Sequence, residues 1–332
     1  MTRVPDLDVR PLTTLTPEQA EGVAAVAAAA TAADGVAPLS EQTLLSLTAP
    51  AGSARHYLGY AAGELHGYAV ADVAGGGASV EVVVEPGQRR HGLGDALWRA
   101  VEREHPTAKV WAHGDLPAAR TWAAREGMVR VRELHKMARA LGPDDLSPGT
   151  TTLPPGYTAR AFRPGSDEQA WLATNAAAFA SHPEQGRMTL ADLRDRMAQP
   201  WFDPEGFIVV EADDAPGEVA AFHWTKVHEG GPHDAGVPGG PHSDVPGGPH
   251  DGGVDAAPAH GEVYVVGVHP DHQGRGLARP LTALGLAHLA AQGLTEVVLY
   301  VDGDNVGALR TYTGLGFRSI MVDVMYSAAV HH

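Results

Sequence analysis

One pattern occurs twice in this chain, 184 residues apart: a β-branched strand, then a proline, then a glycine-containing loop that leads into a helix. In the first half the strand residues Val82–Val84 precede the loop 89–94, and in the second half Val266–Val268 precede the loop 273–278. A short solenoid unit repeats every ~20–50 residues, so this spacing indicates that a whole domain is duplicated. The length of 332 residues suits two domains.

Strands and helices alternate in the same order in both halves, which predicts an α/β fold. We expect a first domain over 1–140, a linker over 141–156 that is rich in Pro, Gly, Ser and Thr, and a second domain over 157–332. Helices are expected over 16–33, 94–104, 117–126, 167–180, 190–197, 279–292 and 305–315, and strands over 55–60, 66–73, 79–84, 110–112, 129–138, 207–212, 218–226, 262–268, 296–302 and 319–325.

An unusual segment interrupts the second half. Residues 229–260 contain 9 Gly and 6 Pro among 32 residues and repeat Gly-Gly-Pro-His three times. Such a run buries too little apolar surface to offset its ordering entropy, so we expect a disordered insertion. Its His233, His242 and His250 lack the rigid support that a metal site needs, and we expect no functional metal there.

Composition excludes several classes of protein. The 24 Lys and Arg against 40 Asp and Glu give a net charge of −16, which argues against a general nucleic-acid or membrane-surface binder. The chain has no Cys, and this excludes disulfides, thiolate metal sites and cysteine nucleophiles. No apolar run approaches the ~18 residues of a membrane span, and the first residues lack a signal-peptide core. We expect a cytoplasmic protein.

The repeated loop has a clear physical logic. Glycines allow the backbone to approach a ligand closely, and the start of the following helix presents N–H groups to an anion. Arg89, Arg90 and Arg275 add positive charge to an otherwise acidic protein, so a diphosphate is the natural occupant. A turn without any ligand is the alternative for one copy, but two copies favour a binding site. A dinucleotide-binding fold is disfavoured, since its glycine motif follows the first strand.

With these residues in view, each half resembles the GNAT acetyltransferase family, whose pyrophosphate loop has this pattern. The chain is similar in particular to the mycothiol synthases within that family, along nearly its whole length except 229–260. The matching runs are 34–38, 178–186, 222–226, 261–268, 299–305, 310–317 and 322–326. The resemblance implies two tandem GNAT domains, each with a mixed, mostly antiparallel sheet flanked by helices.

The resemblance also implies an activity: acetyl transfer from acetyl-CoA to the cysteine amine of cysteinyl-glucosaminyl-inositol, which gives mycothiol and CoA. No metal is needed. Two alternatives stay open, namely acetylation of another small amine such as an aminoglycoside or a peptide, and a non-catalytic sensor of acetyl-CoA. We expect a monomer, with neither nucleic acid nor membrane as a partner.

Acetyl transfer to an amine needs a base for the amine and an acid for the departing thiolate. By family match these are Glu262 and Tyr312. We expect both side chains on one side of the sheet, within reach of one thioester. In the first half, Ala78 aligns with Glu262, and either Trp122 or Ala123 with Tyr312. The site of the first domain is therefore expected either to bind acetyl-CoA or to be a vestige of such a site. In both cases we expect no catalytic turnover there.

The binding residues follow from the same match. The second half would hold acetyl-CoA with Val266, Gly267, Val268, Gln273, Gly274, Arg275, Gly276, Leu277, Ala278, Arg279, Asn305, Val306, Gly307, Ala308, Leu309 and Arg310. The first half would use Val82, Val83, Val84, Arg90, His91, Gly92, Leu93, Gly94 and Asp95. The acceptor would be bound by Asp34, Glu184, Lys226, Glu262 and Tyr300. Asn305 fits a helix N-cap equally well.

Overall fold

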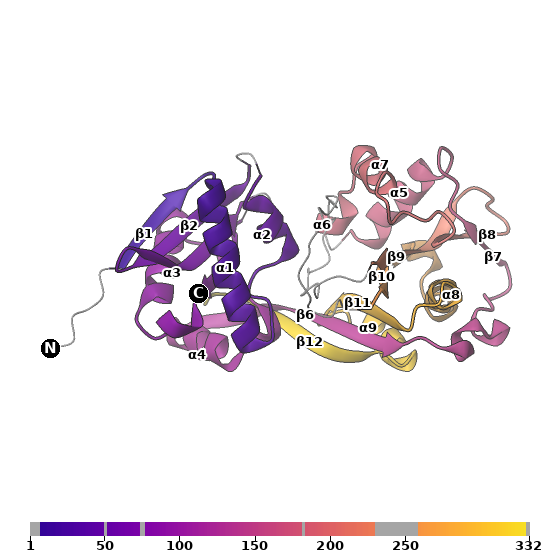
Figure 1. Cartoon of the computed structure of the whole chain (residues 1–332). Helices are drawn as coiled ribbons and strands as arrows, with labels where there is room; N and C mark the ends of the chain where they lie inside the picture. Colours follow the sequence, from indigo (N-terminus) through magenta and orange to yellow (C-terminus); the bar gives the residue numbers. More distant parts are fainter. Residues whose placement is uncertain (1–6, 50–51, 74–76, 181–182, 230–257, 330–332) are drawn as a thin grey trace.

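The computed structural model describes residues 7–49, 52–73, 77–180, 183–229 and 258–329 (Figure 1). The strands are β1 (Leu7–Leu12), β2 (Ala54–Ala61), β3 (Glu64–Asp72), β4 (Ser79–Val84), β5 (Lys109–Ala112), β6 (Met128–Ala140), β7 (Tyr157–Ala161), β8 (Phe207–Ala212), β9 (Val219–His228), β10 (His260–Val268), β11 (Glu296–Asp302) and β12 (Arg318–Ala328). The α-helices are α1 (Pro17–Asp34), α2 (Glu41–Ser46), α3 (Leu93–Glu104), α4 (Pro117–Arg125), α5 (Glu168–Ala178), α6 (Pro183–Gly186), α7 (Leu190–Met197), α8 (Ala278–Ala291) and α9 (Val306–Gly314).

All strands join one mixed sheet in the order β1-β2-β3-β4-β5-β12-β6-β11-β10-β9-β8-β7. The two halves exchange their closing strands: β12, from the second half, pairs antiparallel with β5, whereas β6, from the first half, pairs antiparallel with β11. In Figure 1, β6 and β12 run side by side between the two groups of elements. The sequence predicts both strands correctly but gives no sign of this pairing, because the two edges that accept them are equivalent.

The helices cover the sheet on two faces, as Figure 1 shows for the second half. Helices α3 and α4 pack on the first half and α8 and α9 on the second, and we call this side the α8 face. Helix α1 packs on the other side of the first half and helices α5 and α7 on that of the second, which we call the α5 face. Because side chains alternate along a strand, each strand contributes to both faces.

Four short elements were not predicted from the sequence: β1, β7, α2 and α6. Strands β1 and β7 form the two outer edges of the sheet, where a half-exposed strand carries charged residues and Pro11, and so shows no clear apolar alternation. Helix α2 is only six residues long. By contrast, the predicted N-cap of α1 is confirmed, since the Thr16 side chain accepts a hydrogen bond from the Gln19 N–H.

The first residues of the segment 141–156 pack against the second half and are held there by an ion pair. Leu141 is buried against the α8 face of the second half, and Arg139 donates to both carboxylate oxygens of Asp145 at 2.6 and 2.7 Å. Two short 3-10 turns, Pro143–Leu146 and Pro148–Thr150, follow. Pro and Gly in this segment therefore mark tight turns.

The glycine-rich insertion starts and ends at strand ends, with His228 closing β9 and His260 opening β10. Its residues 230–257, which include His233, His242 and His250, lie outside the described residues. Within the ranges given above, no three His, Asp or Glu side chains are grouped as metal ligands would be. None of the described helices is long and apolar enough to cross a membrane.

His223 makes stability depend on pH. The side chain is fully buried, its Nδ1–H donates to the Leu281 carbonyl at 3.1 Å, and burial lowers the pKa of His223 to about 4. The unfolded chain therefore takes up a proton at this site below pH ~6.5, so the stabilisation is complete above that pH and is lost as the pH falls toward 4.

We expect the free energy of unfolding to fall by up to about 3 kcal/mol from this group over that window. Urea denaturation at pH 7.5 and 5.0 measures about 2 kcal/mol of this fall, because pH 5.0 lies within the window. His223→Gln should have a smaller loss between the two pH values, and an equal loss in both proteins would assign the pH dependence to other groups.

Candidate active site

The site of the second half lies where two parallel strands part. β10 and β11 pair from Gly261 opposite Val297 to Val263 opposite Leu299, and a bulge at Tyr264 follows. Beyond it, β10 continues to Val268 beside a cavity of about 820 Å³. The cavity is lined by Lys109, Arg132, Leu134, Ala178, Phe179, Gln185, Val263, Tyr264, Val265, Val266, Gly267, Val268, Gln273, Ala278, Thr282, Tyr300, Val301, Asp302, Asn305, Gly307, Ala308, Thr311 and Tyr312.

The glycine loop 273–278 lies at this cavity and contributes Gln273 and Ala278 to its lining. Gly274 and Gly276 have φ angles of +73° and +81°, a left-handed backbone that disfavours a Cβ. The Gln273 side chain donates to the Val268 carbonyl at 3.2 Å and so ties the loop to the end of β10. Helix α8 starts directly afterwards, and its first N–H groups and dipole favour an anion at this point.

The first-half loop has the same backbone shape although its sequence differs. Gly92, which aligns with Gly276, has φ +91°, and Arg90, which aligns with Gly274, has φ +70°. Arg90 therefore adopts a conformation that costs a residue with a Cβ roughly 1–2 kcal/mol. The duplicated sequence motif is thus matched by a duplicated loop geometry.

Arg90→Gly should raise the free energy of unfolding by about 1 kcal/mol, because glycine removes the strain. Chemical denaturation measures this gain, and Gly274→Ala is the matched control, which should lose about as much. A loss of stability in Arg90→Gly would show that contacts of the Arg90 side chain outweigh the strain.

Tyr312 lies on α9 at the inner wall of the cavity. Its side chain is buried and packs edge-on against Phe317 at 5.8 Å between ring centroids. Burial raises the pKa of Tyr312, so the phenol keeps its proton at neutral pH. A neutral phenol beside the glycine loop can donate a proton to a departing thiolate.

Glu262 lies on β10 directly opposite Lys226 of β9. Its Oε2 is 2.6 Å from Nε2 of His228. The Lys226 ammonium lies 4.9 Å from the Trp201 ring centroid. In the part of the chain that the structure describes, Glu262 does not line the cavity itself, whereas the next two residues of β10 do.

The expectation that Glu262 and Tyr312 share one side of the sheet is wrong. Val263 packs with Tyr312 on the α8 face, and alternation along β10 places Glu262 on the α5 face. The gap between β10 and β11 joins the two faces, since the cavity is lined both by Tyr300, which points to the α5 face, and by Tyr312. An acceptor and a donor could therefore approach one point from opposite faces.

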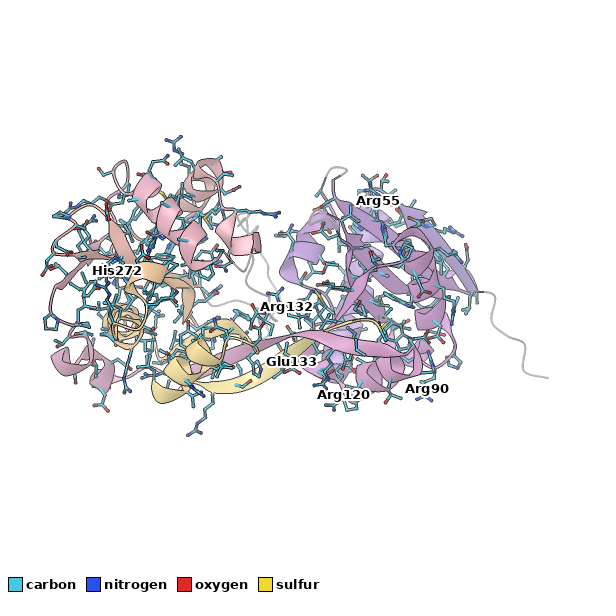
Figure 2. The ribbon with its side chains drawn as sticks, turned by 180° about the vertical axis from the view of Figure 1, so that it is seen from behind. Arg55, Arg90, Arg120, Arg132, Glu133 and His272 are labelled. Carbon is cyan, nitrogen blue, oxygen red and sulfur yellow. The ribbon has the colours of Figure 1, made fainter. Side chains whose placement is uncertain are left out.

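The exchanged strand brings first-half residues to this cavity. Arg132 and Leu134 of β6 line it, and so does Lys109 of β5, a strand that is not exchanged. Arg132 donates to both carboxylate oxygens of Asp302, at 2.6 and 3.2 Å, and its guanidinium lies 5.6 Å from the Trp111 ring centroid. Figure 2 shows Arg132 and its neighbour Glu133 on opposite sides of β6. Arg132 and Leu134 could not be predicted as site residues from the sequence, because their place depends on the strand exchange.

The predicted acceptor residues lie in different places. Tyr300 lines the cavity, with the Lys136 ammonium 5.6 Å from its ring centroid. Asp34 accepts two hydrogen bonds from Arg89, at 2.7 and 2.8 Å, beside the first-half loop, and does not line the second-half cavity in the described structure. Glu184 belongs to α6, and its side chain falls outside the described side chains.

Only some of the predicted cofactor residues of the second half line the cavity; in the described structure its lining does not include Gly274, Arg275, Gly276, Leu277, Arg279, Val306, Leu309 or Arg310. The lining ones are Val266, Gly267, Val268, Gln273, Ala278, Asn305, Gly307 and Ala308. Leu277 is buried in the core instead, and Arg275 donates to the Tyr157 hydroxyl at 3.2 Å. Asn305 fits both interpretations, since it also caps α9 by accepting from the Ala308 N–H at 3.1 Å.

The first half has a matching cavity of about 830 Å³, also beside parting parallel strands, β4 and β5. Of the predicted residues it is lined by Val82, Val84, Arg90, Gly92, Gly94 and Asp95. Trp122 also lines it and donates its Nε1–H to Asp95 at 3.0 Å. The expectation of a cavity without a phenol needs correction: the exchanged strand supplies Tyr326, whose hydroxyl donates to Asp115 at 2.7 Å. The predicted match of Glu262 with Ala78 is wrong by one residue: β10 has a bulge at Tyr264 that β4 lacks, so Ser79, opposite Asp72, holds the position of Glu262. Ala78 packs on the α8 face instead.

The chain is similar to known proteins in both sequence and fold. Residues 177–317 match the Acetyltransferase (GNAT) family. Proteins named mycothiol acetyltransferase are similar at full length: that of Thermomonospora curvata is 49% identical over 96% of both chains. That of Thermobispora bispora is 48% identical over 94% of this chain and 96% of its own, and that of Thermobifida fusca 47% identical over 94% and 95%.

Two solved structures share this fold over nearly the whole chain. A GCN5-related N-acetyltransferase from Sphaerobacter thermophilus superposes with a TM-score of 0.69 at 24% identity, covering 98% of this chain and 96% of its own. A tandem GNAT protein from the clavulanic acid biosynthesis pathway has a TM-score of 0.62 at 19% identity, covering 98% and 100%. The predicted fold class, two tandem GNAT units with helices on a mixed sheet, is confirmed.

Proposed function

Since this chain belongs to the mycothiol acetyltransferase family, we propose that it transfers acetyl from acetyl-CoA to the cysteine α-amine of cysteinyl-glucosaminyl-inositol, giving mycothiol and CoA. The observation that carries the proposal is the cavity between β10 and β11, which brings the glycine loop and the buried phenol of Tyr312 together. Its duplicate in the first half has Ser79, which carries no carboxylate, where the second half has Glu262.

The residues around the cavity fit acetyl-CoA. The loop around Gly274 and Gly276, followed by the start of α8, suits a pyrophosphate. Past the bulge at Tyr264, the backbone of Val266–Val268 can pair with the amides of an extended chain as an added strand would. Asn305 and Gly307 line the cavity wall at the start of α9.

The chemistry follows from the two faces of the sheet. On the α5 face, the carboxylate of Glu262 takes a proton from the acceptor's ammonium, directly or through one water, and the amine attacks the thioester carbon. The carbon–sulfur bond breaks, and Tyr312 gives its proton to the departing thiolate from the α8 face. The amine nitrogen loses its second proton to water as the amide forms, and the phenol is reprotonated from solvent.

The first half is proposed to bind a ligand at its own loop without turnover. Asp34 is held at that loop by Arg89, so its proposed contact with the acceptor would require the ion pair to open. Lys226 and Tyr300 lie on the second-half side, where the acceptor would bind next to Glu262. A cytoplasmic location and a monomeric state stay predictions.

An acceptor panel tests the proposal. The protein is incubated with acetyl-CoA and one of four amines: cysteinyl-glucosaminyl-inositol, glucosaminyl-inositol, an aminoglycoside or a dipeptide. We expect CoA release and a one-acetyl mass gain with the first amine far above the others. Preference for another amine would support a related acetyltransferase, and binding of acetyl-CoA without turnover on any amine would support a sensor.

A further inference from the structure

A histidine contacts the proposed base at the end of β9, where the glycine-rich insertion begins. His228, the last residue of β9, has its Nε2 2.6 Å from Oε2 of Glu262. The two side chains are 17% and 13% exposed, so the hydrogen bond is shielded from most of the solvent. A bond this short and shielded fixes the orientation of the carboxylate.

The ring of His228 is itself held in place. His260, the first residue of β10, stands opposite His228 in the strand register, and the two rings stack at 4.7 Å between centroids and 11° between planes. A stacked ring on paired strands has little freedom to rotate. The hydrogen bond to Glu262 therefore comes from a rigid support rather than from a loop.

Three other charged or titratable side chains near Glu262 are an ammonium, a phenol and a guanidinium, whereas His228 is an imidazole. Lys226, opposite Glu262 on β9, contributes a positive charge. Tyr264, on β10, hydrogen-bonds Arg196 of α7 at 3.1 Å, and burial raises the pKa of Tyr264, so its phenol stays neutral. Among the described neighbours, only His228 and His260 bring an imidazole to this point, and His228 is the one that contacts the carboxylate.

We propose that His228 is the positioning residue of the general base: its Nε2–H donates to Oε2 of Glu262 and keeps the carboxylate ionised and aimed at the acceptor amine. This inference rests on the proposed function, in which Glu262 takes the proton. When the amine N–H bond breaks, the proton moves to Glu262. It then leaves to water, and the hydrogen bond to His228 restores the ionised carboxylate for the next turnover.

The test is the dependence of kcat/KM on pH in two variants. A carboxylate that loses a hydrogen-bond donor holds its proton more tightly, so His228→Ala should move the acid limb upward by roughly one pH unit and lower kcat about tenfold. His228→Gln keeps an N–H donor and should leave the acid limb near that of the wild type. The KM for acetyl-CoA should stay unchanged in both variants.

His66→Ala is the matched control. His66 hydrogen-bonds Glu85 in the first half, so the variant removes a similar pair away from the second-half cavity, and its profile should match the wild type. A wild-type pH profile in His228→Ala would overturn the inference, and so would an equal loss of kcat/KM in both His228 variants at every pH. Thermal melts of each variant show whether it is folded. A wild-type protein that acetylates no amine would instead contradict the proposed function.

Discussion

Glu262→Gln lowers kcat by about 10²–10³-fold, because glutamine keeps the size of the side chain but cannot accept the amine's proton. Its amide can still meet His228, so the fold and the KM for acetyl-CoA should change little. Steady-state kinetics with cysteinyl-glucosaminyl-inositol measure the loss. If Glu262→Gln formed product at the wild-type rate, Glu262 would not be the base.

The matched control for Glu262→Gln comes from the first half. Glu104, the last residue of α3, accepts a hydrogen bond from Tyr57 at 2.9 Å. Tyr57 lies on β2, which is far from β10 in the strand order of the sheet. Glu104→Gln should therefore keep its turnover. If both glutamine variants lost activity equally, the cause would be general damage to the sheet rather than the loss of a base.

His113→Leu destabilises the protein by about 3–5 kcal/mol, the usual cost of removing one partner from a buried ion pair. His113 lies 3.2 Å from both Glu81 and Asp323, and all three side chains are buried. Burial by itself would lower the pKa of His113, but the hydrogen bonds to Asp323 and Glu81 raise it to about 10. The histidine is thus an imidazolium, and leucine would leave two carboxylates buried without it.

This network joins the exchanged strand to the first half, because Asp323 lies on β12, Glu81 on β4 and His113 directly after β5. Urea denaturation measures the loss. Replacing all three side chains by leucine should recover part of it, since an apolar cluster needs no charge partner, although the N–H groups of Ser40 and Gly114 would lose their carboxylate acceptors. If His113→Leu were neutral, or the triple variant no better than the single one, the network would not stabilise the strand exchange.

Much of the fold could be predicted from the sequence because local rules decide it. The β-branched run 82–84, the glycine at Gly276 and the cap at Thr16 each act through neighbouring residues, so their elements were predicted. The strand exchange could not be, because β5 and β11 present equivalent edges and the choice between them depends on distant packing such as the contact of His113 with Asp323.

In the candidate site, too, residues marked by local sequence features could be predicted, whereas residues placed by distant packing could not. The glycine loop and Asn305 were found because spacing and caps mark them in the sequence. Arg132 and Tyr326 were missed, since each reaches a cavity of the other half on an exchanged strand. The faces of Glu262 and Tyr312 were misjudged because periodicity does not show where two parallel strands part.

Assignment of turnover to the second cavity is tested most directly by one pair of variants. Gly276→Val and Gly92→Val place a β-branched residue at matched loop positions, with φ +81° in the second half and +91° in the first. Acetylation of cysteinyl-glucosaminyl-inositol is measured for both. We predict that Gly276→Val loses most of its kcat/KM while Gly92→Val keeps it. Turnover retained by Gly276→Val and lost by Gly92→Val would contradict the account.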